Sequence, residues 1–192
     1  MGFVAALVTG GVLIAGPLVQ QRPATSREPI VINSVFSNID FATNTAEFSD
    51  IVMSQGDSRL TAERASATQV GFTNSQWTFM GRVVIFSAAR GSLRADRAIL
   101  QFRDGELTQV TAIGSPASIE QQRTDPLHPG LGYADQIVYD VKQGSVRLSG
   151  HAQLSDGRNQ ISAPVFLYNV RDEGWQADAP GERRGVHITV VP

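Results

Sequence analysis

From Ile30 to the C-terminus, apolar and polar residues alternate with a period of two over most of the chain. The ranges 133–141, 146–154 and 186–190 are examples. Successive side chains of a strand point to opposite faces, so this pattern predicts half-buried strands. No window beyond Arg27 places apolar residues at helical spacing. We therefore expect an all-β domain, mostly antiparallel. Turn-forming pairs separate its runs at Gly56-Asp57, Asp104-Gly105, Gln143-Gly144, Asp156-Gly157 and Glu173-Gly174.

A weak internal repeat consists of an apolar residue, a spacer, an alanine and then usually an acid. It occurs in the ranges 60–65, 93–98, 132–137 and 161–166, and its alanines are 33, 39 and 29 residues apart. Such a unit fits two strands with one small side chain pointing inward. Stacked layers with a small residue at one position are typical of a rolled sheet, jelly roll or β-solenoid. A generic antiparallel sandwich remains the alternative. Pro164, inside the last copy, indicates a bulge or an edge.

The N-terminal segment differs in character from the rest of the chain. Residues 2–19 carry no charge, and 18 helical residues span roughly 27 Å, enough for a bilayer core. We predict one apolar helix in a signal or membrane-anchor segment (1–22), a polar linker (23–29) and the β domain (30–192). A signal peptide has basic residues before its apolar run, but the first charge here is Arg22. Cleavage and retention therefore stay open, and both export the domain.

Composition excludes most catalytic chemistry. The chain has no cysteine, three scattered histidines and a net charge of −2, so thiol catalysis, metal motifs and a nucleic-acid footprint are not expected. Two hydrolase sets can be assembled, and neither has the G-x-S-x-G elbow around a serine. The sets are Ser149, His151 and Asp156, and Asp125, His128 and Asp135. We predict that the protein is not an enzyme and uses no cofactor or metal.

A series of motifs in fixed order resembles the LptA/OstA-like family of periplasmic lipopolysaccharide-export proteins. The ranges that carry the resemblance are 29–32, 55–56 and 60–63 at the start, then 114–119, 133–139, 146–154, 159–168 and 184–192. For example, Val146–Leu154 matches the strand pattern apolar-x-leucine-x-glycine-x-alanine-x-leucine. The chain departs from the family pattern in the divergent stretch 70–107 and in Ala163-Pro164, where the family usually has glycine-aspartate.

The resemblance implies an antiparallel β-jelly roll whose apolar interior shelters the lipid A acyl chains of lipopolysaccharide on the way to the outer membrane of a Gram-negative envelope. It implies a periplasmic location and partners at the inner and outer membranes. Family members join head to tail through edge strands, so Ile30–Asn33 and Val186–Val191 are the expected edges. We expect the first edge to face the inner membrane and the second the outer membrane. Self-association through the same edges is a further expectation.

From the alternation we predict which inward residues contact acyl chains. The alternative is that these residues form an ordinary protein core. They are Ile39, Phe41, Leu60, Phe86, Leu93, Phe102, Ile137, Tyr139, Leu148, Leu154, Ile161 and Phe166. Trp77 and Trp175 fit either the rim of the roll or its packing. Two other functions stay open. One is a membrane-anchored adaptor of the LptC type that retains residues 2–19. The other is an exported, non-catalytic β-sandwich that binds sugars or serves as a structural module.

Overall fold

The computed structural model describes residues 28–69, 71–121, 130–155, 159–169, 174–178 and 185–189. The predicted apolar helix and signal or anchor segment, and most of the linker, lie outside these ranges and stay predictions. Within the described ranges, no helix is long and apolar enough to cross a membrane.

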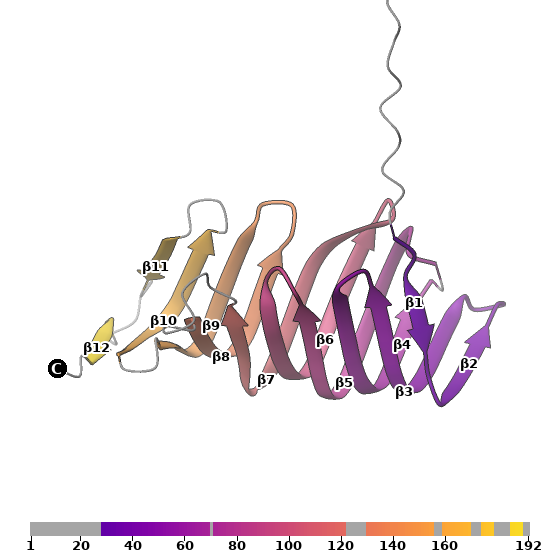
Figure 1. Ribbon diagram of the computed structural model, residues 1–192, viewed down its shortest axis with the longest axis horizontal. Helices are drawn as coiled ribbons and strands as arrows, with labels where there is room; N and C mark the ends of the chain where they lie inside the picture. The colour runs from indigo at the N-terminus through magenta and orange to yellow at the C-terminus, as the bar shows by residue number, and fades with distance from the viewer. Residues whose placement is uncertain are drawn as a thin grey trace, which may run out of the picture.

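Every regular element of the described chain is a strand, and all twelve belong to one antiparallel sheet. The strands are β1 (Val31–Asn33), β2 (Phe36–Asp40), β3 (Thr45–Gln55), β4 (Ser58–Thr68), β5 (Asn74–Ser87), β6 (Gly91–Arg103), β7 (Glu106–Gln121), β8 (Gly130–Asp140), β9 (Ser145–Ser155), β10 (Gln160–Asn169), β11 (Gly174–Asp178) and β12 (His187–Thr189). From β3 to β10 each strand pairs with the next in sequence, so the strands stack along the long axis (Figure 1). The all-β antiparallel prediction is confirmed.

The two ends of the sheet are built alike. Both β1 and β2 pair with β3, on its second and first halves. At the opposite end, β11 and β12 both pair with β10. Each long terminal strand is therefore covered by two short strands. β1 and β12 lie in the ranges that the sequence nominated as edges.

The long strands bend near their middles. Register shifts interrupt each neighbouring pair from β4–β5 to β9–β10, and a bulge of this kind bends a strand and increases its twist. Positive φ angles at Gly81 and Gly150 belong to these bends. The bends follow one another along the roll, so the sheet folds over on itself (Figure 1). Pro164 stands at the β9–β10 shift, as its position in a strand predicted.

The alanine–acid repeat lies at these bends. Ala62, Ala95, Ala134 and Ala163 are 8%, 8%, 0% and 6% exposed, which confirms that the repeat places a small residue on the inner face. The next residue points outward. In β4 this residue is Glu63, whose Oε1 is 2.6 Å from Arg82 Nε. A small side chain suits these buried positions because protein interiors are closely packed.

Candidate lipid-binding interior

The inner face consists of continuous apolar rows that cross the sheet. Residues paired across antiparallel strands point to the same face, so the strand register identifies each row. One row has a buried apolar residue in every strand from β3 to β10. It contains Phe48, Ala65, Phe79, Ala98, Ala112, Ile137, Leu148 and Phe166.

A second row reaches both short edge strands. It contains Ile32, Met53, Leu60, Ile85, Leu93, Ile119, Gly132, Leu154, Ile161 and Ile188. Leu60 and Leu93 in the middle are 5% and 9% exposed, whereas Ile188 at the end is 60% exposed. The apolar row therefore continues to both ends of the roll, with a partly buried residue at Ile32 and a solvent-exposed one at Ile188.

The interior is filled by two packed clusters. In the N-terminal cluster, the Trp77 ring stacks on Phe48 and Phe72 with centroid distances of 5.5 and 5.1 Å. In the C-terminal cluster, Phe166 and Tyr168 contact Trp175. Ile85 and Tyr139 pack against both clusters.

Two side-chain hydrogen bonds, here called the cross-roll contacts, join the two halves of the bent sheet. Arg90, in the turn between β5 and β6, donates to Tyr139 Oη on β8 and lies 5.4 Å from the centroid of its ring. Gln121, the last residue of β7, donates to Tyr168 Oη on β10 at 2.8 Å. Both tyrosines occupy one inner row. Each contact links opposite ends of long strands and holds the roll closed over its interior.

Most of the nominated lipid-contact residues line this interior. Leu60, Leu93, Phe102, Ile137, Leu148 and Phe166 are buried, and Tyr139, Leu154 and Ile161 are partly buried. Ile39 pairs with the buried Ala46 and so shares the inner face, but it is 41% exposed because β2 is an edge strand. The fold places the nine buried and partly buried residues around one interior; contact with lipid stays a prediction for all twelve.

For two nominated residues the inward orientation is wrong. Phe41 is 84% exposed because β2 ends at Asp40, and the chain turns there. Asp40 Oδ1 accepts hydrogen bonds from the backbone N–H groups of Ala42 and Thr43. Hydrogen bonds from the Thr43 side chain, and then from these backbone groups, lower the pKa of Asp40. Phe86 is 46% exposed, because the inner face of β5 there carries Val83 and Ile85 instead.

Trp77 and Phe79, the largest fully buried side chains of β5, are not among the lipid-contact residues nominated from the sequence. Their alternation with the polar residues Gln76 and Thr78 is a signal that could have found Phe79. The inner alanines Ala98 and Ala112, each 0% exposed, were also not nominated; Ala98 pairs with Phe79 across the sheet.

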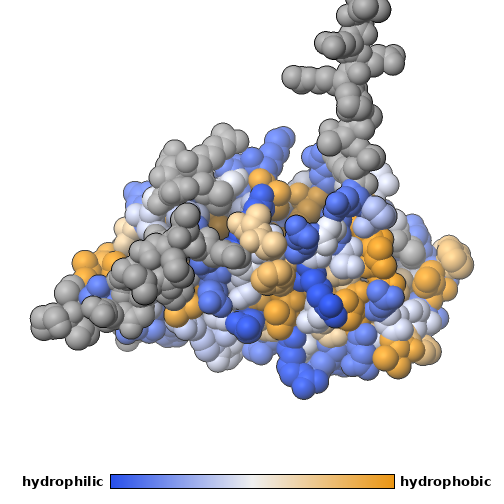
Figure 2. Space-filling model, in the orientation of Figure 1, coloured by the Kyte–Doolittle hydropathy of each residue, from blue (hydrophilic) through white to orange (hydrophobic). Residues whose placement is uncertain are grey.

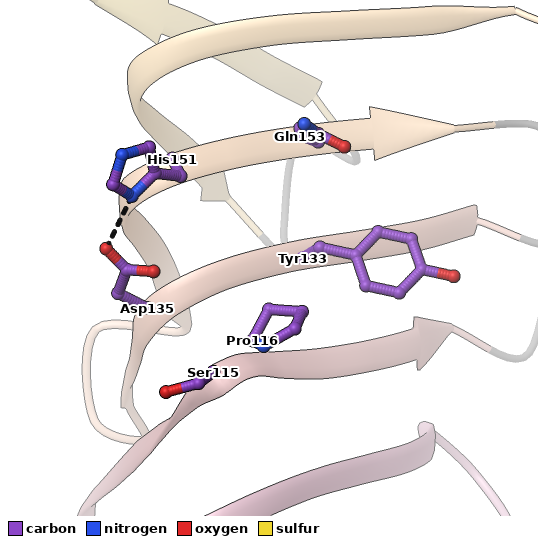
Figure 3. A pocket seen from close by; sticks show the side chains of 6 residues that line it. All are labelled: Ser115, Pro116, Tyr133, Asp135, His151 and Gln153. Atoms are coloured by element: carbon purple, nitrogen blue, oxygen red, sulfur yellow. Dashed lines mark hydrogen bonds and ion pairs between the residues drawn. The ribbon is translucent and has the colours of Figure 1, made fainter.

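The outer face of the bend carries His151 and Ser149 of one hydrolase set and Asp135 of the other. His151 Nδ1 is 2.8 Å from Asp135 Oδ2, and these side chains are 81% and 53% exposed (Figure 3). With Ser115, Pro116, Tyr133 and Gln153 they line a shallow surface pocket. Asp125, His128 and Asp156 lie outside the described residues. A polar contact this exposed contributes little energy. Across the described ranges, no three His, Asp or Glu residues are grouped to hold a metal ion.

Large exposed apolar side chains gather at the ends of the roll. Those at the β1–β2 end are Val31, Val35, Phe36, Ile39 and Phe41, and those at the other end are Val186 and Ile188. Figure 2 shows apolar surface on the β2 end. In the middle of the roll, Phe86 and Ile113 are the exposed large apolar residues among those described. Exposed apolar patches of this kind mark interaction surfaces.

A family model described as LptA/(LptD N-terminal domain) LPS transport protein matches residues 65–174, more than half of the chain. The chain belongs to this family. The matched residues run from the middle of β4 to the start of β11 and contain most of the inner rows. As the sequence analysis predicted, this member of the LPS transport family is not an enzyme.

Two curated relatives carry the name lipopolysaccharide export system protein LptA. That of Haemophilus influenzae is 28% identical over 120 residues, covering 60% of this chain and 67% of the relative. That of Escherichia coli strain K12 is 27% identical over 118 residues, covering 59% of this chain and 60% of the relative. The alignments therefore span about two thirds or less of the relatives' own length.

One solved structure related to this family member is that of LptH from Pseudomonas aeruginosa, described as the LptA homologous periplasmic component of a lipopolysaccharide transport device. It shares 18% sequence identity, and the superposition covers 86% of this chain and 96% of LptH with a TM-score of 0.46.

Proposed function

We propose that the protein carries lipopolysaccharide across the periplasm toward the outer membrane, with the acyl chains held between the two halves of the bent sheet. The observation that carries the proposal is the continuity of the inner rows. Apolar residues run without a charged interruption from Ile32 on β1 to Ile188 on β12. A row with a partly buried residue at one end and an exposed apolar residue at the other offers a lipid chain a path into and out of the roll.

The two hydrogen bonds that join the halves of the roll are weak compared with the burial of a lipid chain. An exposed methylene costs about 0.8 kcal/mol in water, so an acyl chain of about a dozen carbons gains on the order of 9 kcal/mol by burial. Each cross-roll contact is a single hydrogen bond with a net value of about 0.5–1.5 kcal/mol. Breaking the Arg90–Tyr139 and Gln121–Tyr168 hydrogen bonds therefore costs much less free energy than the burial of one acyl chain provides.

We propose that partners dock on the two ends by strand addition. β1 pairs only with β3, and β12 only with β10, among the described strands, so each has one unpaired edge. Backbone groups on such an edge bind another strand, and the exposed Val31 and Ile188 add apolar area to the same surfaces. A second copy or another jelly-roll protein joined this way would extend the inner rows into one path between the inner and outer membranes.

Whether residues 2–19 are removed or retained determines whether the roll is attached to the inner membrane. Their lack of charge suits a signal that is removed or an anchor that stays in the inner membrane. A retained anchor would make the protein an LptC-type adaptor, and a cleaved signal would free it in the periplasm. N-terminal sequencing of the mature protein separates these two forms of the proposal.

Binding of purified lipopolysaccharide tests the proposed function. The purified protein is mixed with radiolabelled lipopolysaccharide or with the same material after removal of its acyl chains, and the complexes are separated by gel filtration. We expect intact lipopolysaccharide to co-elute and the deacylated sugar to elute alone. Equal binding of both would contradict the proposal and favour a sugar-binding β-sandwich.

A further inference from the structure

Two buried polar groups on the inner face of β5 have no partner. Ser75 is 7% exposed and Trp77 is 1% exposed, and neither Ser75 Oγ nor Trp77 Nε1 makes a hydrogen bond within the described chain. A buried polar group without a partner carries a desolvation cost, so native proteins rarely keep one without a role. Two such groups on one strand of an apolar interior indicate that something else satisfies them.

The inner face of β5 changes in polarity along the strand. From the turn before β5 toward the bend, its inward residues are Ser75, Trp77, Phe79 and Val83. A hydroxyl group and an indole N–H thus lie nearest the strand end, and hydrocarbon lies nearest the bend. This order matches an acyl chain whose tail reaches the bend and whose polar linkage stays near the edge of the roll.

The surroundings of Ser75 are those expected for the polar end of a lipid. Ser75 lines an open pocket of about 350 Å³ at the ends of β4, β5 and β6. Gln76, Gln101 and Arg103 line the same pocket from the outer face of the sheet, and the inward Phe102 lines it next to Ser75. A headgroup at this strand end would meet these polar side chains at the rim of the sheet, while its chain passes inward over Trp77.

Phe72 covers the path that such a chain would take. Its ring lies 5.1 Å from Trp77 at an interplanar angle of 5° and 5.0 Å from Phe102. Phe72 comes from the connection between β4 and β5 and is only partly buried. A chain that displaces this ring replaces one apolar contact with another, so the exchange leaves the aromatic cluster covered.

We propose that Ser75 and Trp77 form a binding site for the ester or amide carbonyl oxygen that joins an acyl chain to its headgroup. The proposal rests on the lipid-carrying function above and names the site of one chain. Trp77 Nε1 can only donate and Ser75 Oγ can donate, so an oxygen acceptor is the kind of partner that each of them lacks. The carbonyl group of an acyl linkage is the acceptor that every lipopolysaccharide acyl chain brings with it.

The indole N–H of Trp77 reports directly on this contact. The chain has two tryptophans, so a ¹⁵N–¹H spectrum contains two indole signals, and the variant W77F identifies that of Trp77. On addition of lipopolysaccharide we expect the Trp77 proton signal to move downfield and its exchange with solvent to slow. If lipopolysaccharide co-elutes with the protein while this signal stays in place, the site is wrong and the carrier function stands. If lipopolysaccharide does not bind at all, the carrier function fails first.

Replacing Ser75 by alanine separates a binding role from a structural one. S75A removes an unsatisfied hydroxyl group, so the lipid-free protein should melt at the same or a higher temperature. Loss of one hydrogen bond should weaken lipopolysaccharide binding about fivefold. The matched control is S66A on the outer face of neighbouring β4, which should bind as the wild type does. A lower melting temperature together with unchanged binding in S75A would overturn the proposal.

Discussion

The Asp135 carboxylate lies directly over Gly150, so that a methyl group built on Gly150 would approach Asp135 Oδ2 to 2.5 Å. Glu63 covers Gly81 in the same way at another bend. Both glycines have positive φ angles, 76° and 79°. In these two copies of the repeat, the acid that follows the alanine therefore lies against a bulge glycine of the next strand. In these two copies, the contact gives the outward acid a structural role beside the inward alanine.

Substitution of Gly150 by alanine tests this arrangement. The φ angle of 76° and the overlap with Asp135 should together lower the free energy of unfolding by about 1–3 kcal/mol, as measured by urea denaturation. The matched control is G185A, because a methyl group at Gly185 meets nothing within 4 Å. Equal stability of the two variants would show that the bend tolerates a side chain. The double variant D135A/G150A should recover only the part of the lost stability that comes from the overlap with Asp135, because the strain of the positive φ angle remains.

Enlarging an inner alanine should obstruct the interior. Ala112 is 0% exposed and lies opposite Ala98 and Ile137, so A112L overpacks the roll and should lower the free energy of unfolding by about 1–3 kcal/mol. It should also reduce the lipopolysaccharide bound per protein in gel filtration. T111L places the same side chain on the outer face one residue away and should change stability by less than about 0.5 kcal/mol. If T111L reduces lipid loading as much as A112L, the inner face is not where lipid binds.

The cross-roll contact between Arg90 and Tyr139 should restrain opening. R90A and Y139F should each lower the free energy of unfolding by about 0.5–1.5 kcal/mol, and the double variant should lose less than their sum. Both variants should take up lipopolysaccharide faster in a stopped-flow assay, because the roll opens more easily. R94A, which removes an exposed outward arginine of β6, is the control for lost charge. Uptake at the wild-type rate in R90A and Y139F would mean that opening does not depend on this contact.

Strand addition between copies can be tested with disulfides, since the chain has no cysteine of its own. N33C places a thiol on β1 and T189C places one on β12. Head-to-tail pairing predicts that a mixture of these two variants forms disulfide-linked dimers under mild oxidation, and that neither variant does so alone to the same extent. S92C on β6, away from both ends, gives the background of random collisions. A mixture no more cross-linked than S92C would argue against pairing of copies through these edges.

Much of the fold could be predicted because period-two alternation specifies both strand and face. Leu148, Ile137 and Phe166 were placed correctly on the inner face in this way. The repeat alanines were also placed correctly, because a small residue at a fixed interval indicates a crowded inner position. These features depend on local sequence alone.

Other features depend on contacts that local sequence does not contain. Val83 to Phe86 are four consecutive apolar residues, so alternation could not tell whether Ile85 or Phe86 points inward. Phe41 was misplaced because the turn after Asp40 has no glycine or proline to mark it. The pairing of Asp135 with His151 requires the register of β8 and β9 across a bulge. The unpaired groups of Ser75 and Trp77 appear only when all neighbouring side chains are placed.

Site-specific photo-crosslinking to lipopolysaccharide tests the central claim most directly. A photoreactive residue is placed at Leu148, which is 0% exposed on the inner face, or at its neighbour Arg147 on the outer face. Cells producing each variant are irradiated, and adducts are detected with an antibody to lipopolysaccharide. An apolar interior that carries acyl chains predicts an adduct at position 148 and none at position 147. Equal labelling of both positions, or an adduct at position 147 alone, would contradict lipid transport through the interior of the roll.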